Sequence, residues 1–264
     1  MAIVILNWNQ KRDTIECLES VTKVKYPLFE IVVVDNGSTD GSPDTIGELF
    51  PEITLIVNEE NLGFTGGNNV GMRYALSQGF DYVCLLNNDT IVDPDFLRLM
   101  VEASESHPQV GVAGPTIYYF DQPTAVWSAG GRFDWRHGQA TRLTLDETER
   151  DQYDDVREVD WVTGCAMLIK RAVLEAVGLF DPRLFMYLEE TEWCFRATKT
   201  GVKVVHVPAA KLWHKIPVDP QAVSPRVTYL MVRNHLLFLK TCKVSISTWA
   251  YVIAYYARMI SSYT

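Results

Sequence analysis

Short apolar runs that end abruptly in polar residues are the feature that most constrains the fold of this chain. Residues 31–34 read as a buried strand that ends at Asp35, and residues 82–86 form a second such run that ends at Asn87-Asn88-Asp89. Stretches with the apolar spacing of helices lie between these runs. Short apolar strands that alternate with helices predict an α/β fold with a mostly parallel central sheet and right-handed crossovers.

The alternation extends over the first 115 residues and predicts each element there. We expect strands at residues 2–6, 31–34, 54–57 and 82–86, and helices at residues 13–24, 44–50, 68–78 and 93–106. Further along we expect an ordered apolar run at 161–169, helices at 171–177 and 189–200, and a strand at 203–207. Residues 146–158 are strongly charged and predict a mobile surface loop, and a loop between prolines carries Trp213 and His214. No internal repeat or clear linker interrupts the chain, which predicts one domain with a C-terminal appendage.

Composition and charge exclude some classes of protein. With 264 residues, of which 47% are hydrophobic and 22% charged, the chain can bury a sizeable core. Its net charge of -9 argues against a nucleic-acid surface, which needs a basic face. An acidic protein can still bind a phosphorylated ligand when a metal ion supplies positive charge.

The cysteines and the N-terminus predict a cytoplasmic location. The five cysteines are widely spaced, odd in number and without a C-x-x-C pair, which favours reduced thiols over a disulfide framework or a zinc site. The N-terminus enters a strand directly, without a basic segment followed by a long apolar stretch. We therefore expect no secretory signal peptide.

The last forty residues have a different pattern. Residues 227–239 combine apolar and basic side chains, and residues 244–260 are apolar and aromatic. Seventeen residues fall short of the roughly 20 that a spanning helix needs. The pattern predicts amphipathic helices that either lie at a membrane interface or pack on their own domain or a partner.

The polar residues after the two apolar runs are candidates for ligand binding. In open α/β sheets, ligands bind at the carboxyl ends of the strands. Asp35 is suited to accept hydrogen bonds from a nucleobase or ribose, although one such Asp is often a turn former. Asp89 is a candidate metal ligand, and since one carboxylate needs help, His214 is its candidate partner.

Two further segments are compatible with ligand binding or catalysis, but each also has a purely structural interpretation. Residues 61–71 are rich in glycine but have the spacing of neither a dinucleotide fingerprint nor a Walker loop. Their glycines would let backbone approach a ligand ahead of a helix N-terminus. The cluster Glu189-Glu190-Thr191-Glu192 is either a solvated helix start or the source of a general base whose pKa is raised in an apolar pocket.

Taken in order, these segments resemble the family 2 glycosyltransferases of the GT-A fold. The resemblance covers residues 1–215 through VILNWNQ, VVVDNGSTDGS, NLGFTGGNNVG, LLNNDT, VDWVTGCAMLIKR, GLFDPRLFMYLEETEWCFR and Trp213-His214. Within the family the chain is most similar to the bacterial rhamnosyl- and galactofuranosyltransferase-type branch, which builds cell-envelope glycans on lipid carriers. The resemblance implies a Rossmann-like sheet flanked by helices, with a C-terminal helical segment.

The resemblance also implies a role for each site residue. The nucleotide contacts are Leu6, Asn7, Trp8, Asp35, Asn68, Asn87 and Asn88. Asp89, in the family's Asp-x-Asp position, and His214 would hold Mg²⁺ or Mn²⁺, whereas Asn87 replaces the first carboxylate of that motif by an amide. Glu190 is the catalytic base, and the acceptor-side residues are Trp161, Gly164, Cys165 and Glu189. Residues 1–115 then form the nucleotide-sugar half of one domain, 116–225 its acceptor half, and 226–264 an amphipathic helical segment.

The implied function is inverting transfer of a sugar from a dTDP- or UDP-linked donor, with rhamnose as a candidate. The acceptor is a hydroxyl of a glycan or of a polyprenyl-diphosphate-linked glycan, reached at the inner face of the plasma membrane through residues 226–264. The alternative is a non-catalytic sugar-nucleotide-binding module, which the replacement at Asn87 favours and the acidic cluster opposes. A sugar-1-phosphate nucleotidyltransferase would need a glycine- and lysine/arginine-rich loop after the first strand, where the chain has Asn7-Trp8-Asn9-Gln10.

Overall fold

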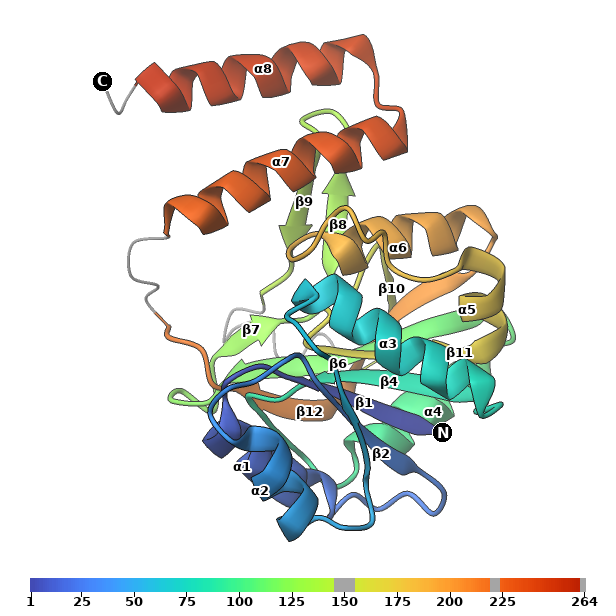
Figure 1. The fold of residues 1–264 in the computed structure, drawn as a ribbon. Helices are drawn as coiled ribbons and strands as arrows, with labels where there is room; N and C mark the ends of the chain where they lie inside the picture. Colours follow the sequence, from blue (N-terminus) through green and yellow to red (C-terminus); the bar gives the residue numbers. More distant parts are fainter. Residues whose placement is uncertain (145–154, 219–223, 262–264) are drawn as a thin grey trace.

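The computed structural model describes residues 1–144, 155–218 and 224–261, and its centre is a twisted sheet with helices on both faces (Figure 1). The strand order is β10-β12-β6-β11-β4-β1-β2-β3, with β5 paired to β12 and β7 paired to β6. The strands of this sheet are β1 (Ala2–Asn7), β2 (Glu30–Asp35), β3 (Thr54–Val57), β4 (Tyr82–Asn87), β5 (Thr90–Val92), β6 (Val110–Tyr119), β7 (Val126–Ser128), β10 (Arg157–Val159), β11 (Ala166–Lys170) and β12 (Lys203–His214). A separate hairpin consists of β8 (Gly131–Asp134) and β9 (Gln139–Arg142).

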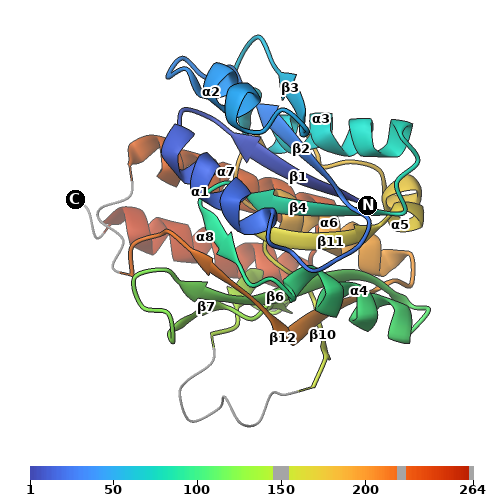
Figure 2. The same ribbon diagram turned by 90° about the horizontal axis from the view of Figure 1, so that it is seen from below.

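The helices divide into two layers and a C-terminal pair. The first layer consists of α1 (Lys11–Val21), α2 (Ser42–Leu49) and α4 (Phe96–Ser106), the second of α3 (Gly63–Ser77), α5 (Arg171–Val177) and α6 (Glu189–Lys199), and the pair of α7 (Pro225–Cys242) and α8 (Ile246–Ser261). Figure 2 views the sheet from the side of α1 and α4. Side chains alternate along β1, with Ile3 and Ile5 in the core under α1 and α4, and Ala2 and Val4 in the core under α3 and α6. Two separate cores therefore hold the sheet between its helical layers.

The sheet is mostly parallel, as the sequence predicts. Strands β1, β2, β3 and β4 are mutually parallel. Strand β6 runs in the same direction because the antiparallel strand β11 lies between it and β4, and β12 is parallel to β6. The expected boundary at residue 115 falls inside β6, so the two expected halves share one strand.

Three predictions about elements need correction. Helix α3 begins at Gly63 rather than at Asn68, so the glycine-rich segment is helical. Strand β12 continues to His214 past a register shift between Val207 and Lys211, because a bulge accommodates Pro208, which has no N–H to donate. Of the expected charged loop at 146–158, residues 146–154 lie outside the described ranges, whereas Arg157 and Glu158 belong to β10.

The C-terminal pair lies at one end of the molecule, with α8 outermost (top of Figure 1). Helix α7 packs through Phe238 on Phe195 of α6 and Phe133 of β8, with ring centroids 6.3 and 5.5 Å apart. The expected appendage is therefore joined to the body by an aromatic cluster. Among the helices in the described ranges, none is both long and apolar enough to cross a bilayer.

Candidate active site

The ends of β1, β2 and β4 place the predicted polar residues side by side. The chain runs outward from β1 through β2 to β3 and then returns to β4 on the other side of β1. In register, Asn7 pairs with Asp35, and Leu6 pairs with Asn87. A crevice at such a reversal of strand order is the usual ligand site of open α/β sheets.

Asn7 is the centre of a buried hydrogen-bond network at these strand ends. Its amide nitrogen donates to Asp35 Oδ2 at 2.6 Å, and its oxygen accepts from Thr14 Oγ1 at 2.8 Å and Asn88 Nδ2 at 3.4 Å. The other oxygen of Asp35 accepts from the backbone N–H of Ser38 at 2.8 Å. These bonds hold α1 and the two strand ends together. Nucleotide contact by Asn7, Asp35 and Asn88 stays a prediction.

Trp8 directly follows β1 and is 49% exposed, so it presents aromatic surface next to these strand ends. The next residue, Asn9, has a left-handed φ of 53° and accepts a hydrogen bond from the N–H of Thr39 at 2.7 Å. This bond joins the loops after β1 and β2. An exposed ring held by fixed loops suits stacking on a nucleobase.

Asp89 and His214 form the candidate metal pair. Antiparallel pairing sets His214 opposite Thr90, and His214 Nε2 lies 3.0 Å from Asp89 Oδ1. Both side chains are largely buried, and these two atoms have no well-aligned hydrogen-bond partner among the described residues. Adjacent ligands in an octahedral shell with bonds of 2.0–2.1 Å lie about 3 Å apart. The pair therefore fits a divalent ion that completes its shell with water and phosphate oxygens.

The surroundings of this pair include residues that the sequence does not single out. The ring of Trp127 meets His214 edge-on, with centroids 4.8 Å apart. Lys215 follows His214 but turns away, because its Nζ donates to Asp13 Oδ1 at 2.9 Å and also to Glu16. Burial lowers the pKa of Lys215, but the hydrogen bonds that it donates to Glu16 and Asp13 outweigh this and raise its pKa. Lys215 thus fastens β12 to α1.

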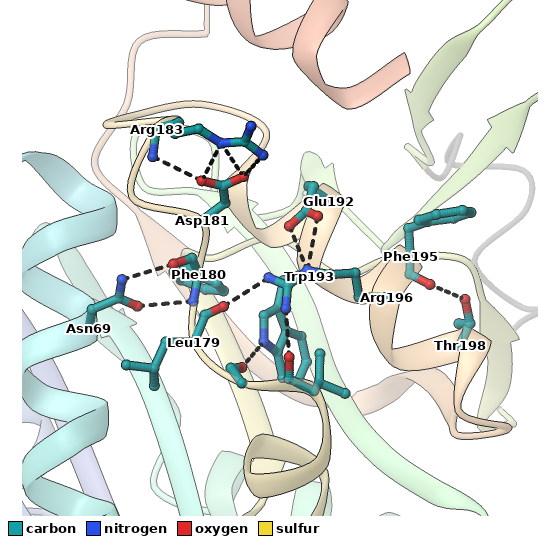
Figure 3. Close-up of polar contacts among 12 residues, drawn as sticks. Asn69, Leu179, Phe180, Asp181, Arg183, Glu192, Trp193, Phe195, Arg196 and Thr198 are labelled. Carbon is teal, nitrogen blue, oxygen red and sulfur yellow. Dashed lines mark hydrogen bonds and ion pairs between the residues drawn. The ribbon is translucent and has the colours of Figure 1, made fainter. Parts of the chain in front are cut away.

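The acidic cluster at the start of α6 separates into three environments. Glu189 is buried, its Oε2 has no partner among the described residues, and burial followed by the nearby charge of Glu190 raises its pKa well above the ordinary range. Glu190 is partly exposed, and desolvation raises its pKa as well. Glu192 pairs with Arg196, whose Nε lies 2.9 Å from Glu192 Oε1 (Figure 3). Glu190 is the one suited to exchange protons with a bound substrate.

The turn at residues 163–165 connects Glu190 to the end of β4. The carbonyl of Cys165 accepts from the N–H of Asn87 at 2.8 Å. One residue earlier, a Cβ added to Gly164 would lie 3.6 Å from Glu190 Cβ and 3.1 Å from the ring of Phe64. The backbone of Gly164 therefore lies between the general-base candidate and α3.

The other predicted acceptor-side residues are less accessible. The indole of Trp161 packs closely on Gly131, since a Cβ added to Gly131 would lie 2.1 Å from the indole ring. Cys165 is buried, with 3% of its surface exposed. Acceptor contact by Trp161, Cys165 and Glu189 stays a prediction.

The glycine-rich segment serves helix packing. A Cβ added to Gly67 would lie 2.3 Å from a methyl group of Leu6, and a Cβ added to Gly71 would lie 2.2 Å from a methyl group of Val4. These glycines let α3 approach β1 closely. Asn68 donates from its side chain to the carbonyl of Phe64, four residues earlier, at 2.9 Å. Its role in nucleotide binding stays a prediction.

Two buried asparagines organise loops around the site without any signal in the sequence pattern. Asn36 donates to the carbonyl of Gly63 at 3.0 Å and accepts from the N–H of Leu62 at 3.1 Å. Asn69 donates to the carbonyl of Phe180 at 2.9 Å and accepts from its N–H at 3.0 Å (Figure 3). A buried asparagine differs from a turn asparagine only in its surroundings, which the sequence does not display.

Comparison with known proteins identifies relatives of this chain. A family model described as glycosyl transferase family 2 matches residues 2–178. The N-acetylglucosaminyl-diphospho-decaprenol L-rhamnosyltransferase of Mycobacterium tuberculosis is 28% identical over 77% of this chain and 74% of its own length. The dTDP-rhamnosyl transferase RfbF of Shigella flexneri is 23% identical over 90% of this chain and 79% of its own length.

Solved structures resemble this fold at lower identity. GalNAc-T7, determined with UDP, GalNAc and Mn²⁺, has a TM-score of 0.69 at 19% identity, and the match covers 90% of this chain but 47% of that one. The mannosyltransferase PcManGT of Pyrobaculum calidifontis, determined with GDP-Man and Mn²⁺, has a TM-score of 0.58 at 19% identity over 97% of this chain and 74% of its own. The likeness establishes the GT-A fold.

Proposed function

This chain belongs to glycosyl transferase family 2, and from that premise we propose that it transfers a sugar, with inversion, from a nucleotide-diphosphate donor to a hydroxyl of a glycan acceptor. The observation that carries the proposal is the convergence of Asp89, His214 and Glu190 around the ends of β1 and β4. Donors linked to dTDP or UDP are favoured, with rhamnose as a candidate, because two relatives are rhamnosyltransferases by name.

The mechanism assigns the proton transfer to Glu190. As the acceptor oxygen bonds to the anomeric carbon of the donor sugar, the bond from that carbon to the diphosphate breaks on the opposite face. Glu190 takes the proton of the acceptor hydroxyl, and its raised pKa makes it a stronger base than an exposed carboxylate. Trp8 would stack on the nucleobase, while the network around Asn7 holds α1 and the ends of β1 and β2 in place.

Asp89 and His214 would hold Mg²⁺ or Mn²⁺. Such an ion, when bound, offsets the charge of the diphosphate. We expect Asp89→Ala to weaken binding of UDP or dTDP about tenfold or more in Mn²⁺ and to make binding insensitive to EDTA, as judged by calorimetry. Asp121→Ala, at an exposed position, is the matched control. If wild type and Asp89→Ala bind equally well and respond equally to EDTA, this metal site is wrong.

We assign the C-terminal helices, which pack on α6 and β8 through Phe238, a peripheral contact with the cytoplasmic membrane face. Several apolar residues of α7 and α8 are exposed, among them Tyr229 at 62%, Ile246 at 89% and Ile253 at 63%. The basic side chains Arg226, Lys240 and Lys243 on the same segment suit anionic lipid headgroups. A polyprenyl-diphosphate-linked acceptor would be presented at that surface.

A panel of UDP- and dTDP-linked sugars tests the function. Purified protein, Mn²⁺ and a glycosyl-diphospho-polyprenol acceptor should release nucleoside diphosphate and form a glycosylated product with at least one donor. A non-catalytic binding module would instead show a thermal shift with a sugar nucleotide but neither product nor nucleotide release. That result would overturn the proposal.

A further inference from the structure

A strained loop leads directly into the proposed catalytic helix. Phe185, Tyr187 and Leu188 have left-handed φ values of 61°, 76° and 68°, and Leu188 immediately precedes α6. Residues 183–188, here called the 183–188 loop, contain no glycine, although glycine is the residue that adopts this conformation readily. Such strain persists only where the surrounding structure holds it.

Helix α7 supplies most of the contacts that hold the 183–188 loop. The amide nitrogen of Asn234, a fully buried residue, lies within hydrogen-bond distance of three backbone carbonyls, those of Leu184, Met186 and Tyr187, at 2.8, 2.7 and 2.8 Å. Arg233 Nη2 donates at 2.9 Å to two carbonyls, those of Arg183 and Leu184. Each bond fixes the plane of a peptide group, and with it the φ and ψ angles on either side.

The orientation of the Asn234 amide is set by its neighbour. Arg233 Nε donates to Asn234 Oδ1 at 2.9 Å, so the nitrogen must face the loop. Asn234 lies on the inner face of α7 together with Leu230 and Phe238, spaced four residues apart. An amide at this position on a packed helix has little freedom to move.

The opposite side of the 183–188 loop rests on α3. The carbonyl of Phe185 accepts from the N–H of Thr65 at 3.0 Å, and a Cβ added to Gly63 would lie 2.5 Å from Phe185. Consequently the carbonyls of residues 183–187 all accept hydrogen bonds, four of them from α7 and one from the start of α3. The loop is held between the C-terminal helix and the helix that packs on β1.

We propose that Asn234 is a positioning residue for glycosyl transfer: by binding the carbonyls of the 183–188 loop, it fixes where α6 begins and where Glu190 stands. This inference rests on the proposed function, in which Glu190 is the base. Arg233 assists Asn234 by orienting its amide and by donating to the carbonyls of Arg183 and Leu184, of which Asn234 reaches only the second. On this view α7 is part of the catalytic centre as well as of the proposed membrane-facing segment.

The test compares three variants of the full chain, Asn234→Ala, Arg233→Ala and Leu239→Ala. Leu239 is fully buried on α7 in the apolar cluster of Phe195, Phe238 and Val252, and its side chain has no polar atom, so its variant loosens α7 without removing the hydrogen bonds to the loop carbonyls. We expect Asn234→Ala to lower kcat about 10²-fold, as for a misplaced catalytic group, with the Kd for UDP or dTDP in Mn²⁺ changed less than about twofold. Arg233→Ala, at a partly exposed position, should fold and show a smaller loss of the same kind.

Two readouts separate positioning from general destabilisation. Hydrogen exchange of the unliganded protein should accelerate at the amides of residues 184–190 in Asn234→Ala and Arg233→Ala but not in Leu239→Ala. Turnover is measured with the sugar nucleotide that the wild type uses fastest in the panel. Losses of kcat that follow the loss of Tm in all three variants would refute the proposal. Unchanged exchange at residues 184–190 in Asn234→Ala and Arg233→Ala would refute it as well. If the wild type uses no donor in the panel, the proposed function fails, and the exchange result still decides whether the loop is held by Asn234.

Discussion

Three carboxyl groups within four residues of α6 have different surroundings, and those surroundings determine what each can do. Glu192 is neutralised by Arg196, Glu189 is buried with its Oε2 atom unpaired among the described residues, and Glu190 borders Gly164 and the exterior. On a helix, Glu189 and Glu192 share a face that turns inward, whereas Glu190 points elsewhere. Position on the helix is therefore the reason why we propose Glu190 for proton transfer.

We expect Glu190→Gln to reduce kcat by about 10²–10⁴-fold, the usual contribution of a positioned general base. Binding of UDP or dTDP should change little, because Gln keeps the size of the side chain. Steady-state rates and calorimetry measure the two effects separately. Glu48→Gln, at an exposed position on α2, is the control, and near-wild-type turnover in Glu190→Gln would exclude Glu190 as the base.

The raised pKa of Glu189 predicts a pH-dependent cost in stability. Burial makes the folded protein hold this proton more tightly than the unfolded chain, in which the carboxyl titrates near about 4.3. The Glu189 carboxyl therefore does not destabilise the fold at a pH below its unfolded-state pKa. As the pH rises from there toward the folded-state pKa, this carboxyl lowers the free energy of unfolding progressively.

Glu189→Gln removes this titration. Its Tm should equal that of the wild type near pH 4 and exceed it at higher pH, with the difference growing until the pH reaches the folded-state pKa, as measured by thermal unfolding at a series of pH values. A Tm difference that stays constant with pH would contradict the raised pKa.

At the scale of elements, the glycines of α3 show how packing replaces local propensity. Glycine normally weakens a helix, yet α3 contains Gly67 and Gly71 because the helix lies so close to β1 and β2 at these positions. Such a pattern reads as a loop when only the chain is considered, which is why the predicted helix begins five residues late.

Two glycine-to-alanine variants separate packing from propensity. Gly71→Ala forces a methyl group toward Val4 and should destabilise the protein by about 1–3 kcal/mol. Gly47→Ala on α2 meets only Leu55 at an ordinary 3.8 Å and should stabilise it by roughly 0.5–1 kcal/mol. Denaturant unfolding measures both, and effects of the same sign and size would contradict this account.

Strand β12 illustrates a second limit at the element scale. Its first residues, 203–207, form an apolar run that predicts a strand, but Pro208 then suggests its end. Pairing with β6 and β5 carries the strand on to His214, because hydrogen bonds from neighbours outweigh the local break. That continuation is what brings His214 to Asp89.

At the scale of the whole molecule, the two C-terminal helices have different relations to the body. Helix α7 is fastened by Asn234 and the aromatic cluster around Phe238, whereas much of the apolar surface of α8 remains exposed. Deleting both helices would remove the contacts of the 183–188 loop, so membrane contact is better tested by surface substitutions.

We expect the double variant Ile246→Glu/Ile253→Glu to float with vesicles of phosphatidylethanolamine and phosphatidylglycerol much less than the wild type does. Withdrawing two such side chains from the lipid costs about 3–6 kcal/mol of apolar burial. Leu28→Glu, which replaces an exposed apolar residue between α1 and β2, is the matched control. Equal flotation of all three proteins would exclude this surface as the contact.

The sequence by itself determined the alternating elements, the two polar strand ends and the ordered motifs of the family, because periodicity and short motifs are local properties of a chain. It placed Asp35, Asp89 and Glu190 as candidates without locating them relative to one another. Only the tertiary structure decided that Asn88 turns inward, that His214 meets Asp89 at 3.0 Å, and that Asn234 holds the approach to Glu190. These outcomes depend on contacts between residues far apart in the sequence, and burial and partners at such contacts are set by the packing of the whole sheet and its helices.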